Sequence, residues 1–517
     1  MKNHNTVGVG DDFALNTSPQ CLMHGVVQDG AINTLPDNVL LEVFNSYRQS
    51  SQDPENRPWK WDMLIQVCRK WRNIVLASPL RLDLWLLCTH RTPVRRTLDC
   101  WPSLPIVIRY CASLEFRPPS PEDEDNVIAA LEHHHRVREI QLAVTSSLLE
   151  KIVKLMQVSF PKLTYLSLWL DKDRSNGSVP GLPSSFLGQC APRLRNLSLI
   201  GVPFPDLPRL LSSSRGLTSL RLLEVPDTGY ISPHAMATCL STLTNLVVLC
   251  LEFRFSKPPS NNERGHSLPL SRNRATLPTL THFNFRGPSD YLEELLARID
   301  APFLNHVDIT FFNQLIFQVP HLSHFINRME MLKSAEVAEM ESSFGSGVSI
   351  KLDQGGASST QGTIGHPLSL CISCGVLEWQ ISSMAQICSQ SPVFSHVKRL
   401  DVRADYLRLG YRWKDESVPW VELFHSFTSV ETLSISGELC THVAHALEDE
   451  ATEMLVVVEL LPELRVLHFE CSRKSASVEN YDTIRKKFGR PVDVQHVSFP
   501  SPEIWDNVSD AKTSDCR

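Results

Sequence analysis

The sequence lacks long hydrophobic runs. A membrane-spanning helix needs about 18 or more consecutive apolar residues, and the stretch from Val456 to Leu461 is among the longest in this chain. Residues 1–30 are polar and hold no apolar core of the length that a secretory signal needs. We therefore expect no membrane partner, and we expect the protein to act in the cytoplasm, the nucleus or both.

Neither sign of charge dominates, and cysteine is sparse. The 517 residues include 50 Lys and Arg against 57 Asp and Glu, which gives a net charge of −7. A chain-wide basic surface is therefore not expected, and no nucleic-acid partner is predicted. The 14 cysteines are too few for a disulfide scaffold of this length. Several stand alone among apolar residues, as Cys68, Cys250 and Cys388 do, which favours reduced and buried thiols.

The common catalytic and metal-binding motifs are also missing from the sequence. It contains no Walker loop, H-E-x-x-H, G-x-S-x-G, dinucleotide fingerprint or RING-like spacing of Cys and His. Aspartic proteases need two catalytic triplets, and Asp227-Thr228-Gly229 stands alone. The segment Cys371-Ile-Ser-Cys374 lacks the second pair that structural zinc sites use, and His133 to His135 fit the solvated end of a helix. We expect no catalytic residue, no metal and no cofactor.

What the chain has in abundance is one spacing of apolar residues, L-x-x-L-x-L. Clear copies place their apolar positions at Leu163/Leu166/Leu168, Leu194/Leu197/Leu199, Leu217/Leu220/Leu222, Leu246/Leu249/Leu251, Leu280/Phe283/Phe285 and Leu304/Val307/Ile309. Further copies are Val137/Ile140/Leu142, Leu332/Ala335/Val337, Val397/Leu400/Val402, Val430/Leu433/Ile435 and Leu464/Leu467/Phe469. The long gap before Val397 predicts one more, degenerate copy around Leu368 and Leu370. Internal repeats of this kind dominate the architecture of a chain.

Each copy predicts a short strand, and the segments between copies predict helices. The last two apolar positions alternate with another residue, so they point to one face of a strand. Helical spacing runs over residues 148–156 and 291–299, and the acidic run Glu122 to Asp125 favours a helix start. The fold class is therefore α/β, with stacked units that cannot bury their apolar faces alone. Long loops are expected over 256–275 and 345–365. An ordinary α/β domain with leucine-rich strands is the alternative.

This repeat resembles the leucine-rich-repeat family in an irregular form. The family's Asn or Cys after the strand motif is replaced here by Asp171, Val202, Val225 and Arg254. The resemblance implies a solenoid in which the residue between the last two apolar positions of each strand faces outward and contacts a partner. These outward positions carry neither a basic stripe nor an aromatic ladder, which favours a protein partner over nucleic acid.

A helical block precedes the repeats. Pro36 suits the first turn of a helix, where its missing N–H is not needed. Leu35, Val39 and Val43 are four residues apart and form one apolar face of that helix. A second stretch with helical spacing includes the run Val67-Cys68-Arg69-Lys70-Trp71, and we expect the block to close at Leu84-Trp85.

The order of these landmarks is similar to that of the F-box family: Leu35-Pro36, then Val67-Cys68-x-x-Trp71, then Leu84-Trp85. The extended link from Tyr47 to Asp62 departs from the family pattern, and it resembles the F-box-like proteins of fungi. The resemblance implies docking onto a Skp-type adaptor and, through it, onto a cullin–RING ubiquitin ligase. A helical unit of about 50 residues buries little core alone, so leftover apolar surface suits a partner.

The predicted organisation has five parts. A disordered tail covers 1–30, a small all-α F-box module 31–90, a Pro-rich transition 91–125, an irregular α/β leucine-rich-repeat solenoid 126–495, and a second disordered tail 496–517. The predicted adaptor-binding residues are Leu35, Pro36, Val39, Leu40, Val43, Val67 and Trp71. The predicted substrate-binding residues are Tyr165, Ser167, Trp169, Arg221, Arg254, Asn284 and Asp308.

The predicted function is that of a non-catalytic substrate receptor of a Skp/cullin/F-box ubiquitin ligase, whose repeats hold a protein substrate. One alternative is a repeat scaffold that binds partners without recruiting a ligase. The other is a hydrolase built on Asp227 or the thiols, which is the least favoured.

Overall fold

The computed structural model describes residues 35–49, 64, 67–77, 83–91, 93–101, 104–111, 120–171, 179–254, 274–312, 316–343, 347–354, 366–373, 376–404, 418–437, 439–453, 460–470, 476–487 and 490–496. The chain divides into two compact units, Met1–Leu82 and Asp83–Arg517. The predicted tail 1–30, the predicted tail 496–517 apart from His496, most of the link from Tyr47 to Asp62 and most of the loop 256–275 lie outside the described residues.

The first unit contains helices α1 (Asp37–Gln49) and α3 (Arg69–Ala77). Helix α1 begins directly after Pro36, whose carbonyl accepts the N–H of Val39 at 3.0 Å and of Leu40 at 3.1 Å. Its buried side chains are Leu40, Leu41 and Phe44, and those of α3 are Ile74 and Val75. The buried stripe of α1 therefore lies one residue round the helix from the predicted Leu35/Val39/Val43 face.

The second unit is built on a 16-stranded sheet in the order β1-β2-β3-β4-β5-β6-β7-β9-β11-β14-β13-β12-β15-β16-β17-β18. The strands are β1 (Leu84–Leu87), β2 (Ile106–Cys111), β3 (Val137–Val144), β4 (Tyr165–Leu170), β5 (Asn196–Ile200), β6 (Ser219–Val225), β7 (Val248–Phe253), β9 (His282–Gly287), β11 (His306–Phe312), β12 (Val337–Ser343), β13 (Gly347–Asp353), β14 (Leu368–Ser373), β15 (Arg399–Ala404), β16 (Thr432–Ser436), β17 (Val466–Glu470) and β18 (Asp493–His496). Strands β8 (Ala275–Thr276) and β10 (Ile299–Asp300) form a separate parallel pair. The α/β class is confirmed.

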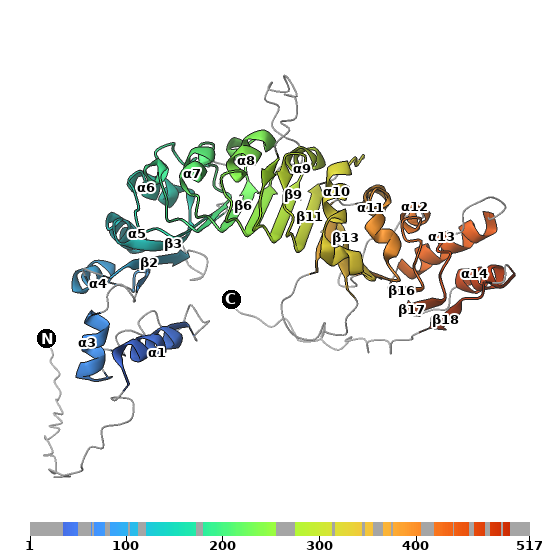
Figure 1. Ribbon diagram of the computed structural model, residues 1–517, viewed down its shortest axis with the longest axis horizontal. Coiled ribbons are helices and arrows are strands. Elements are labelled where there is room, and N and C mark those ends of the chain that lie inside the picture. The colour runs from blue at the N-terminus through green and yellow to red at the C-terminus, as the bar shows by residue number, and fades with distance from the viewer. Residues whose placement is uncertain are drawn as a thin grey trace, which may run out of the picture. The chain divides into compact units, whose positions relative to one another are not determined.

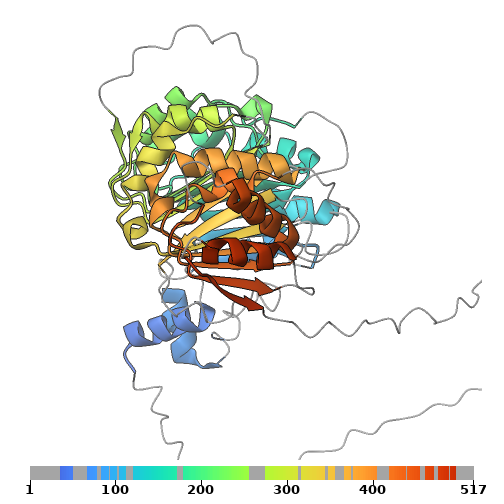
Figure 2. The same cartoon turned by 90° about the vertical axis from the view of Figure 1, so that its right-hand side faces the viewer.

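Helices cover one face of this sheet (Figure 1). They are α4 (Val94–Cys100), α5 (Pro121–Glu132), α6 (Ser146–Leu155), α7 (Leu207–Ser213), α8 (Pro233–Leu240), α9 (Ser289–Leu296), α10 (Pro320–Asn327), α11 (Leu377–Ser389), α12 (Trp420–Phe424), α13 (Leu439–Glu453) and α14 (Ala476–Lys487). Short 3₁₀ helices are η3 (Phe186–Gln189), η4 (Asp227–Gly229), η5 (Glu330–Ser334) and η6 (Pro392–His396). Figure 2 brings β17 and β18 to the front and shows α13 and α14 on one side of them. Parallel strands need such crossover connections, and the other face carries no helix from this set.

The repeated leucine spacing forms the same turn in successive copies. The N–H of Leu163 donates to the carbonyl of Phe160 at 3.1 Å, and Leu194 repeats this with Ala191 at 3.1 Å. The next residue then joins the neighbouring copy, since the N–H of Thr164 donates to the carbonyl of Arg138 at 2.8 Å. Leu163 and Leu194 are thus buried at a tight turn, and the following two leucines of each of these copies fill the core.

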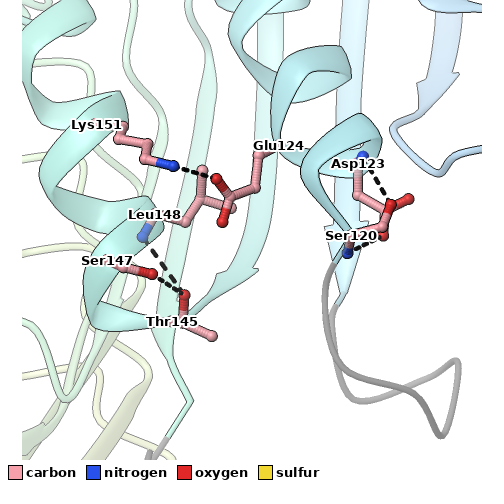
Figure 3. Close-up of polar contacts among 7 residues, drawn as sticks. All are labelled: Ser120, Asp123, Glu124, Thr145, Ser147, Leu148 and Lys151. Atoms are coloured by element: carbon pink, nitrogen blue, oxygen red, sulfur yellow. Dashed lines mark hydrogen bonds and ion pairs between the residues drawn. The ribbon is translucent and has the colours of Figure 1, made fainter.

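The N-terminal ends of neighbouring helices are fixed by side chains (Figure 3). Ser120 and Asp123 form a capping box at α5, in which each side chain accepts the other's backbone N–H. Thr145 caps α6 by accepting the N–H of Leu148 at 3.4 Å. Lys151 of α6 forms an ion pair with Glu124 of α5, so the two helices are joined directly. The acidic run 122–125 therefore marks a helix start, as predicted.

The middle of the sheet departs from the predicted chain of loops and repeats. Residues 347–353, expected as loop, form strand β13, which pairs antiparallel with both β12 and β14. The copy assigned to Leu332/Ala335/Val337 is shifted: Ala338 pairs with Leu400, so the strand positions are Ala338 and Met340. The degenerate copy around Leu368 and Leu370 is confirmed as β14, which pairs parallel with β11. A pattern of parallel repeats does not predict an antiparallel hairpin. Because of the hairpin of β12 and β13, strands β12, β13 and β14 lie in the sheet in the reverse of their order in the sequence.

The boundary of the helical block also differs from the prediction. Leu84 and Trp85 were expected to close the block, but they belong to β1, the first strand of the second unit. Leu84 pairs with Ile106, and Trp85 lies under the guanidinium of Arg109, 4.1 Å from the ring centroid. Alternating burial over Leu84–Leu87 has the period of a strand, and its pairing with β2 settles the local structure.

Candidate interaction surfaces

One face of helix α1 carries exposed apolar side chains. Val39 is 39% exposed and Val43 is 44% exposed, one turn apart on the helix. Pro36 at the start of α1 is exposed as well, and Val67, just before α3, is 58% exposed. These four residues, Pro36, Val39, Val43 and Val67, are called the helical apolar set below. All of them belong to the predicted adaptor-binding residues, and all are accessible in the first unit.

The other predicted adaptor residues are less accessible. Leu40 is fully buried, so it belongs to the core rather than to a contact surface. It follows Val39 by one residue, which turns its side chain about 100° round the helix. Trp71 is half-buried and packs on Phe44 with ring centroids 4.7 Å apart. Leu35 is half-buried, and its carbonyl accepts the Lys70 ammonium at 2.9 Å, which ties the start of α1 to α3.

The second surface is the helix-free face of the sheet. The predicted outward positions fall into register on neighbouring strands: Ser167 pairs with Ser198, Ser198 with Arg221, and Arg221 with Cys250. The series continues through Asn284 and Asp308. The flanking leucines are buried, so the alternation predicted from the sequence is confirmed on these strands. Asp401 is the exception, because its carboxylate is buried between Arg399, at 3.0 Å, and Arg403, at 3.8 Å.

Three of the predicted substrate residues already have partners within the chain. Arg254 forms an ion pair with Glu224 at 3.0 Å, and its guanidinium lies beside Gly201. The Asn284 amide donates a hydrogen bond to the Asp308 carboxylate at 3.0 Å across β9 and β11. These side chains are held by their neighbours, and a partner would have to compete with those contacts.

The remaining four, Tyr165, Ser167, Trp169 and Arg221, make no side-chain hydrogen bond or ion pair with the residues that the structure describes. They come from β4 and β6, on the same face of the sheet. Trp169 is 43% exposed and Arg221 is exposed too. The predicted substrate-binding residues therefore form two groups: three whose side chains are bound to neighbours within the chain, and four whose side chains are available to a partner.

Sequence reasoning missed two apolar residues that lie in line with Trp169. The register places Ala143, Trp169, Ile200 and Leu223 side by side on β3, β4, β5 and β6. Ile200 and Leu223 are half-buried, and Ala143 is buried. The signal was present, since each of the last three directly follows the final leucine of its copy. We call Trp169, Ile200 and Leu223 the apolar row.

Strands β12, β13 and β15 present a different, charged surface. Lys351 of β13 forms an ion pair with Glu341 of β12 at 2.9 Å, and Asp401 of β15 is paired with two arginines. Arg403 stands opposite Glu341 in the register of β12 and β15. Positive and negative side chains therefore compensate one another on this half of the face.

Burial shifts the pKa of two thiols and one carboxyl on this face. Burial raises the pKa of the Cys250 thiol and of the Cys371 thiol, and nearby Asp308 raises both further. Burial also raises the pKa of Glu252, and Arg286 opposes that shift. A raised thiol pKa reduces the thiolate fraction that a nucleophile requires. Cys374, the second cysteine of the C-x-x-C, lies outside the described residues. Cys440 is disulfide-bonded, which departs from the expectation of reduced thiols.

The other motifs have structural roles. Asp227-Thr228-Gly229 forms the short helix η4 after Pro226, the turn that the sequence favoured. His134 Nδ1 donates a hydrogen bond to the carbonyl of Ser159 at 2.9 Å, and its ring packs edge-on to Phe160. Burial lowers the pKa of His133 and of His135. Within the described ranges, no group of three or more His, Cys, Asp or Glu is arranged to hold a metal ion.

Comparison with known proteins gave no match that bears on these surfaces. No protein-family model matches the chain, and no curated protein matches its sequence. Among the described helices, none has both the length and the apolar character needed to cross a membrane.

Proposed function

We propose that this protein is the substrate receptor of a Skp/cullin/F-box-type ubiquitin ligase. Its first unit would dock onto a Skp-type adaptor as an F-box, and its second unit, an irregular leucine-rich-repeat solenoid, would hold a protein substrate. The chain itself would perform no chemistry. Its contribution would be to keep a substrate lysine close to the charged partner enzyme.

The observation that carries this proposal is the helical apolar set. Val39, Val43 and Val67 are between 39% and 58% exposed on a unit whose two described helices bury only a few large side chains. A helical unit this small gains stability when such residues are covered. The sequence landmarks Leu35-Pro36 and Val67-Cys68 directly precede α1 and α3, and Trp71 lies on α3, in the order that the F-box resemblance requires.

The repeat scaffold without ligase recruitment is the second candidate, and one observation favours it. The Leu84-Trp85 pair, which completes the F-box pattern in sequence, belongs to β1 and pairs with β2. Because that pair lies in a strand of the second unit, the first unit contains fewer of the landmarks of the F-box family. Both candidates share the sheet face as a protein-binding surface, so adaptor binding separates them.

Co-purification with a recombinant Skp-type adaptor tests the proposal. We expect the wild-type chain to retain the adaptor, and we expect the double variant Val39→Asp/Val43→Asp to lose it by about tenfold or more, because each carboxylate would be buried without a partner. Val158→Asp is the matched control, since Val158 is 45% exposed and lies in the second unit.

The circular dichroism spectra of all three chains must agree for the comparison to count. A folded wild-type chain that ignores the adaptor would refute the receptor function and favour the scaffold. Equal loss in the Val158 control would show that the effect is not specific to the first unit.

A further inference from the structure

The outward side chains of the sheet in the second unit are charged on some strands and uncharged on others. This difference favours one part of the face for binding a partner. On β12, β13 and β15 the outward side chains form ion pairs with one another, at 2.9 Å for Lys351–Glu341 and 3.0 Å for Arg399–Asp401. On β4 and β5 the outward positions are Tyr165, Ser167 and Trp169, followed by Asn196, Ser198 and Ile200, with no charge among them. Covering the charged half would mean desolvating compensated ions, whereas covering the uncharged half buries apolar surface.

The apolar row has a definite size. Trp169, Ile200 and Leu223 are in register on adjacent parallel strands, with Ala143 at one end. Four neighbouring strands spaced by about 4.8 Å span about 14 Å. An extended peptide of about four residues covers that distance. Trp169, at 43% exposure, is the large aromatic anchor of the row, the residue type that most often dominates a protein interface.

Arg221 sets the charge at the end of this row. It lies on β6, two residues before Leu223, and it is exposed. Its register neighbours are Ser198 on β5 and Cys250 on β7, neither of which is an acid. The nearest acid along β7 is Glu252, whose pKa is raised by burial, a shift that Arg286 rather than Arg221 opposes. Glu224, which lies on β6 with Arg221, forms an ion pair with Arg254. Among the residues that the structure describes, the Arg221 guanidinium therefore forms no ion pair, and it lies beside apolar residues.

We infer that the apolar row is the docking surface for a protein segment that combines aliphatic or aromatic side chains with an adjacent carboxylate. This rests on the proposed function, for which it names the class of substrate segment. The apolar side chains lie along Trp169, Ile200 and Leu223, and the carboxylate pairs with Arg221. Arginine suits this role because its planar fork binds a carboxylate through two hydrogen bonds.

Selection from a displayed library of random peptides of about twelve residues, on the full-length chain, tests this inference. We expect the selected peptides to share at least two apolar residues next to Asp or Glu. The strongest of them, made synthetically with a fluorescent label, is then titrated with wild-type chain and variants by fluorescence anisotropy. Trp169→Ser and Leu223→Ser should each weaken binding by about tenfold or more.

Charge reversal gives the sharpest comparison. Arg221→Glu should weaken binding of the acidic peptide by about tenfold or more and should favour the same peptide with Lys in place of its acid. Arg221→Lys should retain the preference for the acid. His468→Ala is the control, since His468 occupies the same outward position on β17, and it should change the affinity by less than about threefold.

Selection of no peptide, selection of basic peptides, or undiminished binding by Trp169→Ser would overturn the inference. Its failure is distinguishable from failure of the proposed function, because adaptor co-purification does not involve the sheet face. Peptide binding without adaptor binding would leave the docking surface standing and assign it to a scaffold.

Discussion

At the scale of single residues, the sheet face shows that neighbours decide whether a side chain is available to a partner. Trp169 and Arg254 were singled out for the same role, yet Arg254 is held by Glu224 and lies against Gly201, whereas Trp169 is 43% exposed. Alternation along a strand predicts which side a residue faces. It does not predict an ion pair between residues 30 positions apart, because that depends on strand order and register.

A pair of histidines on this face predicts a dependence on pH. The rings of His282 on β9 and His306 on β11 stack with centroids 4.6 Å apart, and the hydroxyl of Thr281 lies 2.8 Å from Nδ1 of His282. Burial, and then the neighbouring His306, lower the pKa of His282 below its ordinary value. The unfolded chain therefore binds the proton more tightly, so this site's contribution to stability is present above about pH 6.5 and is lost as the pH falls below it.

Titration by NMR of the chain carrying ¹³C-labelled histidine measures this directly. We expect the His282 resonance to titrate below pH 6.5 and its midpoint to rise in His306→Gln, which removes the second positive charge. His234→Gln is the control, because His234 lies on α8, away from the stacked pair. A midpoint that stays in place in His306→Gln would contradict the coupling.

At the scale of elements, the regular repeats were predictable and the hairpin was not. The copies from Leu163 to Ile309 locate strands β4, β5, β6, β7, β9 and β11 because each of these strands repeats one local pattern of buried and outward residues. Strand β13 breaks the pattern by pairing antiparallel with two neighbours. Its sequence alternates too, over Val348, Ile350 and Leu352, but nothing local tells the direction in which a strand will pair. The Leu84-Trp85 strand was missed for a related reason, since four residues carry little periodicity.

Gly347 at the start of β13 is the position on which the hairpin depends. Its φ of +119° is one that side-chain-bearing residues rarely adopt, and an added Cβ would lie 1.9 Å from the carbonyl oxygen of Ile372 in β14. We expect Gly347→Ala to destabilise the protein by about 2 kcal/mol or more, because both backbone strain and a backbone clash must be relieved. Scanning calorimetry of the full chain measures the effect.

Gly216→Ala is the matched control for this substitution. The nearest atom to a Cβ at Gly216 is a carbonyl oxygen 3.9 Å away, which is ordinary contact. We expect its transition temperature to stay close to that of the wild type. A Gly347→Ala chain as stable as Gly216→Ala would show that β13 does not hold the close approach to β14 described above.

At the scale of the whole molecule, the two units expose different kinds of side chains. The first presents Val39, Val43 and Val67 on helices, and the second presents Tyr165, Trp169 and Arg221 on a sheet. The division at Leu82 was predictable as a change from helical to strand-and-helix patterning, although the sequence placed it a few residues later. The partners themselves are not readable from the chain, because a contact surface specifies chemistry rather than a name.

Hydrogen exchange of the full-length chain, with and without a saturating Skp-type adaptor, shows whether the first unit binds the adaptor. We expect slower exchange over α1 (Asp37–Gln49) and α3 (Arg69–Ala77), with unchanged exchange over β4 to β6. That outcome would place the adaptor on the first unit and leave the sheet face free for a substrate. Exchange that is unchanged over both helices, or slowed only over the strands of the sheet, would contradict it.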